Sequence, residues 1–342
     1  MEQSFIVSSM SKAKSEETRE IAATEDFAFE APLRPQTLAE FIGQDPIRER
    51  LEVLVGAAKQ RNEALGHCLF CGPPGLGKTT LASILAKAMG SQLTSVSAPV
   101  IDKPGDLAGV LTKLNDGDVF FIDEIHRLNR SVEEYLYQAM EDFTLDLMID
   151  SGPAARSVRV PLKRFTLAGA TTRAGLLTAP LRTRFAFSCR LDYYPSNVLE
   201  TVLQRTSRIL NLEVESEALH EIAKRSRGTP RIANNLLRWV RDFAQMRAEG
   251  CMSKDVVIKA LAMLAIDDRG LDEMDMKILD VIIDHYDGGP VGINTIAIAV
   301  GEEGGTIEEV YEPYLIMQGF LKRTPRGREA TALAYQHRSK CQ

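Results

Sequence analysis

The sequence has 342 residues, of which 44% are hydrophobic and 26% charged, a composition typical of a soluble globular protein with two or three domains. Its net charge of −6 excludes a protein that binds nucleic acid over its whole surface, so any such site is a local basic patch. No stretch is long and apolar enough to span a bilayer, no signal-peptide core begins the chain, and five scattered cysteines suit a reducing compartment, which predicts a cytoplasmic protein.

Residues 1–25 are rich in Ser, Glu and Lys without helical periodicity, and we expect a mobile tail there. Over residues 26–194, short apolar runs alternate with amphipathic stretches. This alternation predicts an α/β domain with a parallel sheet covered by helices on both faces. The expected buried strands are 67–71, 119–122 and 165–170, the expected helices are 47–59, 78–89 and 131–142, and a hairpin turning at Ser151-Gly152-Pro153 is expected within 143–160.

From residue 195 the strand signals disappear. Helical spacing of apolar residues at 196–210, 216–227, 231–248 and 253–264 predicts a small helical domain over 195–266, with Ser216 and Ser253 as N-caps. In the last domain, 267–342, a strong amphipathic helix at 272–286 is followed by helical segments at 294–300 and 306–318. Two strands over 320–331 then flank a turn. Three helices followed by a hairpin is the order of a winged-helix module.

A phosphate-binding loop, Gly72-Pro73-Pro74-Gly75-Leu76-Gly77-Lys78-Thr79, separates the first expected strand from the next helix. Its glycines let backbone N–H groups turn toward phosphate oxygens, and the helix N-terminus adds a favourable dipole. Lys78 supplies a charge to the β- and γ-phosphates, and the Thr79 hydroxyl can ligate Mg²⁺. The motif therefore predicts ATP and Mg²⁺ as ligands.

Polar residues follow the other two expected strands. Asp123 and Glu124 end the strand 119–122, where Asp123 would hold Mg²⁺ through water and Glu124 would polarise the attacking water. Thr172 ends the strand 165–170 and can sense the γ-phosphate or orient that water. His126 is interpreted as a packing or coupling residue rather than a ligand.

Two arginine motifs follow. Leu181-Arg182-Thr183-Arg184-Phe185 offers an arginine that could reach the ATP of a neighbouring subunit, and the residues themselves do not separate Arg182 from Arg184. Gly228-Thr229-Pro230-Arg231 opens a helix of the small domain, from which Arg231 could touch the γ-phosphate across a domain hinge.

The end of the chain is basic. Residues 320–342 hold Lys322, Arg323, Arg326, Arg328, Arg338 and Lys340 against one acid, Glu329. An arginine-rich hairpin tip suits contacts with phosphates or the minor groove, which do not depend on base sequence. Aromatic side chains for stacking are sparse here, which favours duplex over single-stranded DNA.

Taken in order, these motifs resemble the AAA+ ATPases. Segments such as Phe121–Leu128, Gly152–Arg156 and Arg323–Arg328 are similar, more narrowly, to the RuvB family of bacterial Holliday-junction branch-migration motors, over about residues 30–335. The resemblance implies a large ATPase domain, a small helical lid and a winged-helix head. It also implies a homohexameric ring that acts on duplex DNA in recombination, repair and the SOS response. The implied partners are RuvA, contacted by the hairpin within 143–160, and the RuvC resolvase.

The same resemblance assigns roles by position. Gly75, Lys78, Thr79 and Thr80 would hold the phosphates. Thr172 would be the first sensor, Arg184 the finger acting on the neighbouring subunit, and Arg231 the second sensor. The rest of the nucleotide pocket would comprise Leu33, Arg34, Gly77, Glu141, Asp142, Phe143 and Tyr194, and the DNA contacts would be Arg323, Arg326 and Arg328.

Two other functions compete with a DNA motor. A loader or remodelling ATPase would use its winged helix to bind protein, which the basic hairpin disfavours. A nucleotide-controlled switch or a small-molecule kinase would need neither the two further domains nor the finger-like arginine.

Overall fold

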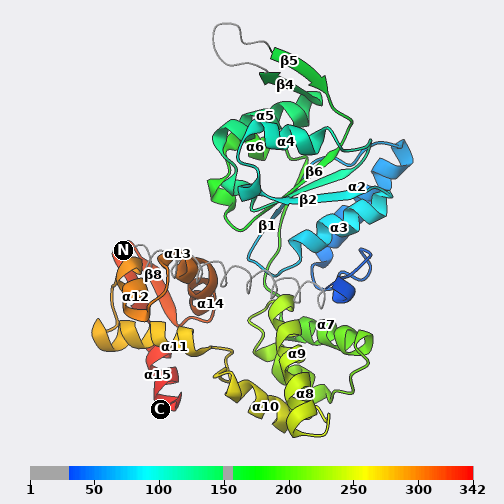
Figure 1. Cartoon of the computed structure of the whole chain (residues 1–342). Helices are drawn as coiled ribbons and strands as arrows, with labels where there is room; N and C mark the ends of the chain where they lie inside the picture. The colour runs from blue at the N-terminus through cyan, green and yellow to red at the C-terminus, as the bar shows by residue number, and fades with distance from the viewer. Residues whose placement is uncertain (1–30, 149–156, 342) are drawn as a thin grey trace, which may run out of the picture. The chain divides into compact units, whose positions relative to one another are not determined.

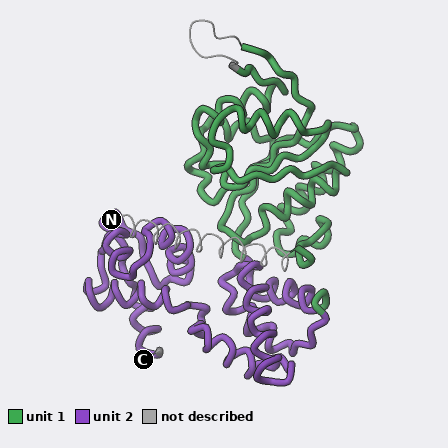
Figure 2. Tube along the Cα trace, viewed as in Figure 1, with its two compact units in different colours: residues 1–193, 208–210 green, residues 194–207, 211–342 purple. Residues whose placement is uncertain are grey.

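The structure, a computed structural model, describes residues 31–148 and 157–341 (Figure 1). It forms two compact units, residues up to Tyr193 with Arg208–Leu210, and residues 194–207 with 211–342 (Figure 2). The expected tail at 1–25 and the hairpin turn at 151–153 lie outside the described residues. Within those residues, no helix has the length and apolar character needed to cross a membrane. The domain borders after residues 194 and 266 stay predictions.

The first unit is built on a five-stranded parallel sheet in the order β2-β3-β6-β1-β7. The predicted strands are its three central ones, β1 (Cys68–Cys71), β3 (Val119–Asp123) and β6 (Thr166–Thr171). The edge strands β2 (Leu93–Ser97) and β7 (Phe187–Arg190) were not predicted. β2 consists of half-buried and exposed residues, and β7 alternates buried and exposed ones, so neither forms a continuous apolar run.

Helices cover both faces of this sheet (Figure 1). The predicted helices are confirmed as α2 (Asp45–Arg61), α3 (Lys78–Met89) and α5 (Arg130–Asp142), whereas the short α4 (Pro104–Leu111) and α6 (Ala179–Thr183) were missed. The apolar sides of α4, α5 and α6 share one core with β3 and β6. The antiparallel hairpin, β4 (Thr144–Met148) with β5 (Ser157–Pro161), extends from the body of the unit.

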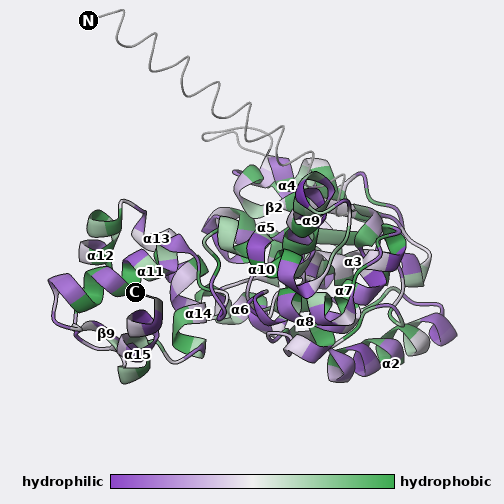
Figure 3. Ribbon diagram, turned by 90° about the horizontal axis from the view of Figure 1, so that it is seen from below, coloured by the Kyte–Doolittle hydropathy of each residue, from purple (hydrophilic) through white to green (hydrophobic). Residues whose placement is uncertain are grey.

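The second unit begins with all four predicted helices, α7 (Ser196–Ile209), α8 (Ser216–Lys224), α9 (Pro230–Arg247) and α10 (Lys254–Met263). Hydrophobic and hydrophilic residues alternate along single helices such as α7, as expected for helices with one buried side (Figure 3). Ser253 is an N-cap as predicted, but the N-cap of α8 is Glu215 and Ser216 is its first helical residue.

The winged helix is confirmed. Its first helix is α11 (Glu273–Asp280) with a π-helical turn at Val281–His285, and its second is α12 (Ile293–Val300). The third runs through α13 (Gly304–Thr306), a π-helical turn at Ile307–Tyr311 and α14 (Glu312–Met317), and the wing is β8 (Leu321–Thr324) paired with β9 (Gly327–Ala330). The last helix, α15 (Ala332–Cys341), was not predicted because its apolar residues follow no helical stripe.

Candidate nucleotide and DNA sites

The parallel sheet brings four of the predicted catalytic residues to one edge, namely Lys78, Asp123, Glu124 and Thr172, but not Arg184 or Arg231. β6 lies between β1 and β3, and all three strands are parallel. The phosphate-binding loop follows β1, Thr172 follows β6, and Asp123 ends β3. The Gly72 N–H donates to the carbonyl of Thr171 (3.1 Å), which ties the loop to the neighbouring strand end. Ligands of open α/β sheets bind at this carboxyl edge.

The loop backbone depends on its glycines. Gly72, Gly75 and Gly77 all have positive φ, and a Cβ atom on Gly77 would lie 2.9 Å from the Phe41 ring. Lys78 Nζ donates to the carbonyls of Gly72 (2.8 Å) and Pro73 (2.7 Å). The lysine is therefore folded back over the loop, where it is poised to meet an anion.

Lys78 is buried, and burial lowers its pKa, while the charges of Asp123, Cys71 and Glu124 act in the opposite direction. The residues proposed for Mg²⁺ are Thr79, in the first turn of α3, and Asp123, whose Oδ1 accepts the N–H of Glu124 (2.9 Å). Hydroxyl and carboxylate oxygens are the ligands that Mg²⁺ prefers. This donor set fits the ion.

Glu124 has an unusual backbone. Its φ of 49° lies in the left-handed region, which non-glycine residues occupy mostly at turns and functional sites. Its Oε2 accepts a hydrogen bond from Arg127 Nη1 at 2.8 Å. Sequence reasoning missed Arg127. The signal was available, because a basic residue three positions after a glutamate can fold back onto it.

Two adjacent threonines end β6, and their hydroxyls have different surroundings. Thr171 Oγ1 lies 2.9 Å from Nδ1 of His126 and accepts the N–H of Arg173 at 3.0 Å. This contact joins His126 to the end of β6, and its role as a packing or coupling residue stays a prediction. Thr172 Oγ1 is buried and has no hydrogen-bond partner among the described residues. Thr172 is therefore the hydroxyl with bonding capacity to spare.

Arg184 is fixed, and Arg182 is not. The Arg184 guanidinium donates to the carbonyl of Pro180 (2.7 Å), pairs with Glu141 (3.1 Å) and lies 4.7 Å from the ring centroid of Tyr137. Arg182 is exposed on the short helix α6, whereas Arg184 is the C-cap residue that follows this helix. The geometry thus distinguishes two arginines that the residues alone left equivalent.

The sequence assigned further residues to a nucleotide pocket, and these residues are described for each unit by itself. In the first, Leu33 is buried, Arg34 is half-buried, and Asp142 ends α5. Phe143 follows it with a left-handed backbone and an edge-on contact to Phe165. In the second, the Tyr194 N–H donates to the carbonyl of Gly228 (2.8 Å). Tyr194 therefore lies beside the turn that carries Arg231, an exposed residue at the start of α9.

The three wing arginines have different environments. Arg328 is buried, with Nη2 donating to Oε2 of Glu312 (2.7 Å), which is also buried. Arg323 is half-exposed and pairs with Glu308 (3.0 Å). Arg326 is exposed at the tip between β8 and β9. Arg326 is thus the wing arginine that lies at the exposed tip, whereas Arg328 is buried and Arg323 is held in an ion pair.

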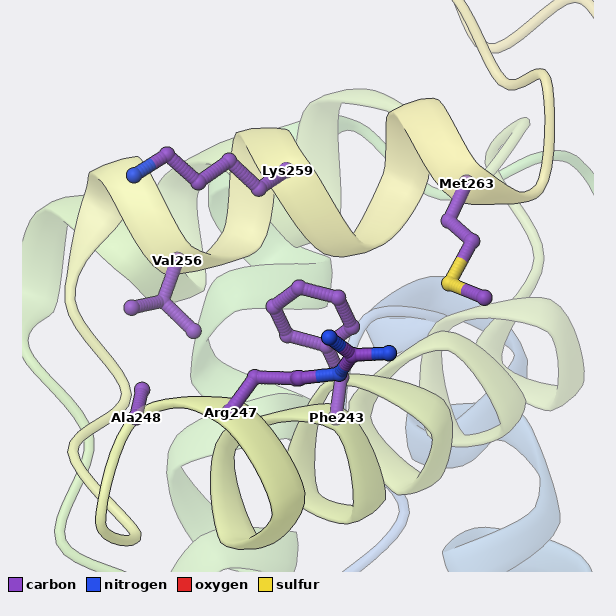
Figure 4. A pocket seen from close by; sticks show the side chains of 6 residues that line it. All are labelled: Phe243, Arg247, Ala248, Val256, Lys259 and Met263. Carbon is purple, nitrogen blue, oxygen red and sulfur yellow. The ribbon is translucent and has the colours of Figure 1, made fainter.

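A separate open groove lies between α9 and α10 of the small helical domain (Figure 4). Its volume is about 580 Å³. Apolar side chains and two basic ones line it, namely Phe243, Ala248, Val256, Met263, Arg247 and Lys259.

Three family models together match almost the whole described chain. The Holliday junction DNA helicase RuvB P-loop domain matches residues 33–191, the RuvB AAA lid domain matches 194–267, and the RuvB C-terminal winged helix domain matches 268–339.

Individual proteins that are similar to this chain belong to the same family. The Holliday junction branch migration complex subunit RuvB of Protochlamydia amoebophila is 70% identical over 313 residues, which cover 92% of this chain and 94% of that protein. The protein of the same description from Chlamydia pneumoniae is 61% identical, with 92% and 93% covered. The solved Thermotoga maritima RuvB Holliday junction branch migration motor is 49% identical, with a TM-score of 0.82 over 90% of this chain and 98% of that chain.

Proposed function

Because the chain belongs to the RuvB family of ATP-driven Holliday junction branch-migration motors, we propose that it hydrolyses Mg²⁺-ATP to drive duplex DNA through a homohexameric ring. It is a nucleotide-binding ATP hydrolase that works in recombination and repair as one subunit of a complex with DNA. We further propose which residues carry out each step, that the metal is Mg²⁺, that the subunits form a ring, and which proteins are the partners.

In the proposed site, the loop N–H groups and Lys78 bind the phosphates. Thr79 and Thr80 lie in the first turn of α3 and add their hydroxyls. Thr79 and Asp123 would hold Mg²⁺, which supplies positive charge at the β- and γ-phosphate oxygens. Glu124 accepts a proton from the attacking water, and Thr172 positions that water or the γ-phosphate. The unpartnered hydroxyl of Thr172 supports this assignment.

Arg184 is the proposed finger and Arg231 the proposed second sensor. A finger must keep its guanidinium in place without the nucleotide, and the contacts of Arg184 with Glu141 and Tyr137 do this. Since the finger would serve a neighbouring subunit, hydrolysis would require the ring. The Gly228–Arg231 turn would report the state of the nucleotide to the second unit.

The wing is the proposed DNA contact. The third helix of the winged helix, Gly304–Met317, contains Glu308, Glu309 and Glu312 and no lysine or arginine. Glu308 and Glu312 pair with Arg323 and Arg328, and this helix has no basic side chain to offer to a phosphate. Contact through Arg326 and its basic neighbours supplies that positive charge and reads no bases, as a motor that moves along any sequence requires.

The proposed partners are RuvA, which would recognise the junction, and the RuvC resolvase. The hairpin β4–β5 is the proposed RuvA contact, since it extends from the body of the first unit. Because the proposed substrate is a junction in chromosomal DNA, we place the protein in the bacterial cytoplasm.

The observation that carries the proposal is the shared carboxyl edge of β1, β6 and β3, which presents the phosphate loop, Thr172 and Asp123 together. Electron microscopy with a non-hydrolysable ATP analogue and a four-way junction tests it. We expect rings that encircle duplex arms, and dissociation of the junction when ATP replaces the analogue. Monomers that release phosphate without moving the junction would contradict the proposal.

The wing assignment predicts different defects for two neighbouring arginines. Arg326→Ala should weaken junction binding about tenfold and reduce the salt slope by about one, because one phosphate contact is lost. Its thermal stability should match the parent. Fluorescence anisotropy over a salt series and thermal unfolding would measure both quantities.

Arg328→Ala is the matched comparison. It leaves the buried Glu312 without its closer cation, with only Arg323 remaining at 3.7 Å, which should destabilise the winged helix by about 3 kcal/mol. An unchanged salt slope in Arg326→Ala, or an unchanged stability in Arg328→Ala, would refute the corresponding assignment.

A further inference from the structure

One arginine of the small helical domain, Arg227, is bonded to the winged helix. Its side chain is 11% exposed. Nε donates to the carbonyl of Gly270 (2.8 Å), and Nη2 donates to Oδ2 of Asp272 (2.8 Å) and to Oδ2 of Asp275. Its guanidinium carbon lies 5.1 Å from the ring centroid of Tyr314. This one side chain therefore contacts the linker, the start of α11 and α14.

The linker between the two domains is itself held in place. Asp267 Oδ1 accepts the N–H groups of Arg269 (2.8 Å) and Leu271 (2.9 Å), and the Tyr314 hydroxyl donates to the carbonyl of Arg269 (2.6 Å). Gly270 has a φ of 77°, and a Cβ atom there would lie 2.7 Å from the carbonyl oxygen of Arg225. The linker backbone thus packs directly on the loop at 225–227 and does not form a free hinge.

The cluster depends on the charge of Arg227. Asp275 is fully buried, and burial raises its pKa to about 7 although Arg227 acts in the opposite direction. A buried carboxyl group that loses its cation either stays charged without compensation or takes up a proton and loses its charge-assisted hydrogen bond. Removing the Arg227 side chain should therefore weaken the contact between the two domains.

Arg227 adjoins the proposed second-sensor turn in the chain, so its contact with the winged helix can transmit a movement of that turn. It immediately precedes Gly228-Thr229-Pro230-Arg231, the proposed second-sensor turn. Its φ of 52° is left-handed, a conformation that a non-glycine residue keeps when its surroundings fix it. A movement of this turn would carry the Arg227 side chain, and with it the start of α11.

We propose that Arg227 is a coupling residue, which transmits movement of the second-sensor turn to the winged helix so that both domains of the second unit turn as one body. The inference rests on the proposed roles of Arg231 and the wing. It predicts that loss of Arg227 separates ATP consumption from DNA movement, whereas loss of a catalytic residue abolishes both.

The test uses the full-length chain with RuvA and a four-way junction, and measures junctions dissociated per ATP hydrolysed. Arg227→Ala should lower this ratio about tenfold while hydrolysis without DNA stays within about twofold of the parent. Asp275→Asn removes the charge at nearly constant volume and should lower the ratio about threefold. Arg225→Ala is the matched control, because Arg225 is equally buried but pairs with Glu221 (3.2 Å) inside the small helical domain. Its ratio should equal that of the parent.

A parental ratio in folded Arg227→Ala, or an equal loss in Arg225→Ala, would overturn the inference. If thermal unfolding shows that Arg227→Ala does not fold, Asp275→Asn decides, and an unchanged ratio in that variant overturns it as well. Arg231→Ala distinguishes failure of the proposed sensor role from failure of the proposed coupling. Parental hydrolysis in Arg231→Ala would remove the sensor role, whereas the ratio in Arg227→Ala tests the coupling directly.

Discussion

Arg184→Ala should lower the rate of ATP hydrolysis by about 10³-fold or more, because a finger stabilises charge that develops only in the transition state. Nucleotide affinity should change by less than about threefold, since uniform binding to the ground state is kept. The pair with Glu141 is largely solvent-exposed on the carboxylate side, so its loss should affect stability little. Phosphate release and the fluorescence of a labelled nucleotide would give the two values.

Two comparisons make the Arg184 prediction specific. Arg182 is exposed and lies two residues before Arg184, and Arg182→Ala should hydrolyse ATP within about twofold of the parent. Mixing equal amounts of Arg184→Ala and Glu124→Gln should restore about a quarter of the parental activity, because a random ring then contains interfaces with one intact finger and one intact base. Absence of any recovery would place the finger within its own subunit.

Glu124→Gln is expected to reduce kcat by about 10²- to 10⁴-fold while the variant still binds ATP, because an amide cannot accept the proton of the attacking water. The left-handed backbone at this position should tolerate the change, as the two side chains have the same shape. Single-turnover hydrolysis with nucleotide binding measured in parallel separates the chemical step from affinity.

The control for Glu124→Gln is Glu134→Gln, which neutralises another glutamate with an exposed arginine partner, Arg130. It should leave kcat unchanged within about twofold. Arg127→Ala should change kcat by less than about fivefold, since its pair with Glu124 is half exposed. More than a tenth of the parental kcat in Glu124→Gln would exclude Glu124 as the general base.

The sequence was most informative where a residue's role is local. The strands β1, β3 and β6 are almost wholly buried and largely apolar, and the phosphate loop is a contiguous motif, so both were predictable. The edge strands were missed because half of their side chains face solvent. The helix α15 was missed because its apolar residues do not gather on one side of the helix.

Pairing over long sequence distances was the part that could not be predicted. Arg328 and Arg326 look equivalent in the sequence, but only Arg328 meets a glutamate 16 positions away in the buried interior. Arg338 likewise belonged to the basic segment, although it pairs with Asp280 and Asp284 of the first winged-helix helix. The net charge of a segment includes such arginines as if they could bind DNA, although ion pairs neutralise them in the folded protein.

The third helix of the winged helix, Gly304–Met317, has no lysine or arginine, which bears on how firmly one subunit would hold DNA. If the wing makes the contact with DNA, as proposed, each subunit would have only the small footprint of its wing. In a ring, the total grip would then be the sum of several weak and separately reversible contacts. One subunit could let go while the others hold, so processive movement would not require any single bond to be strong.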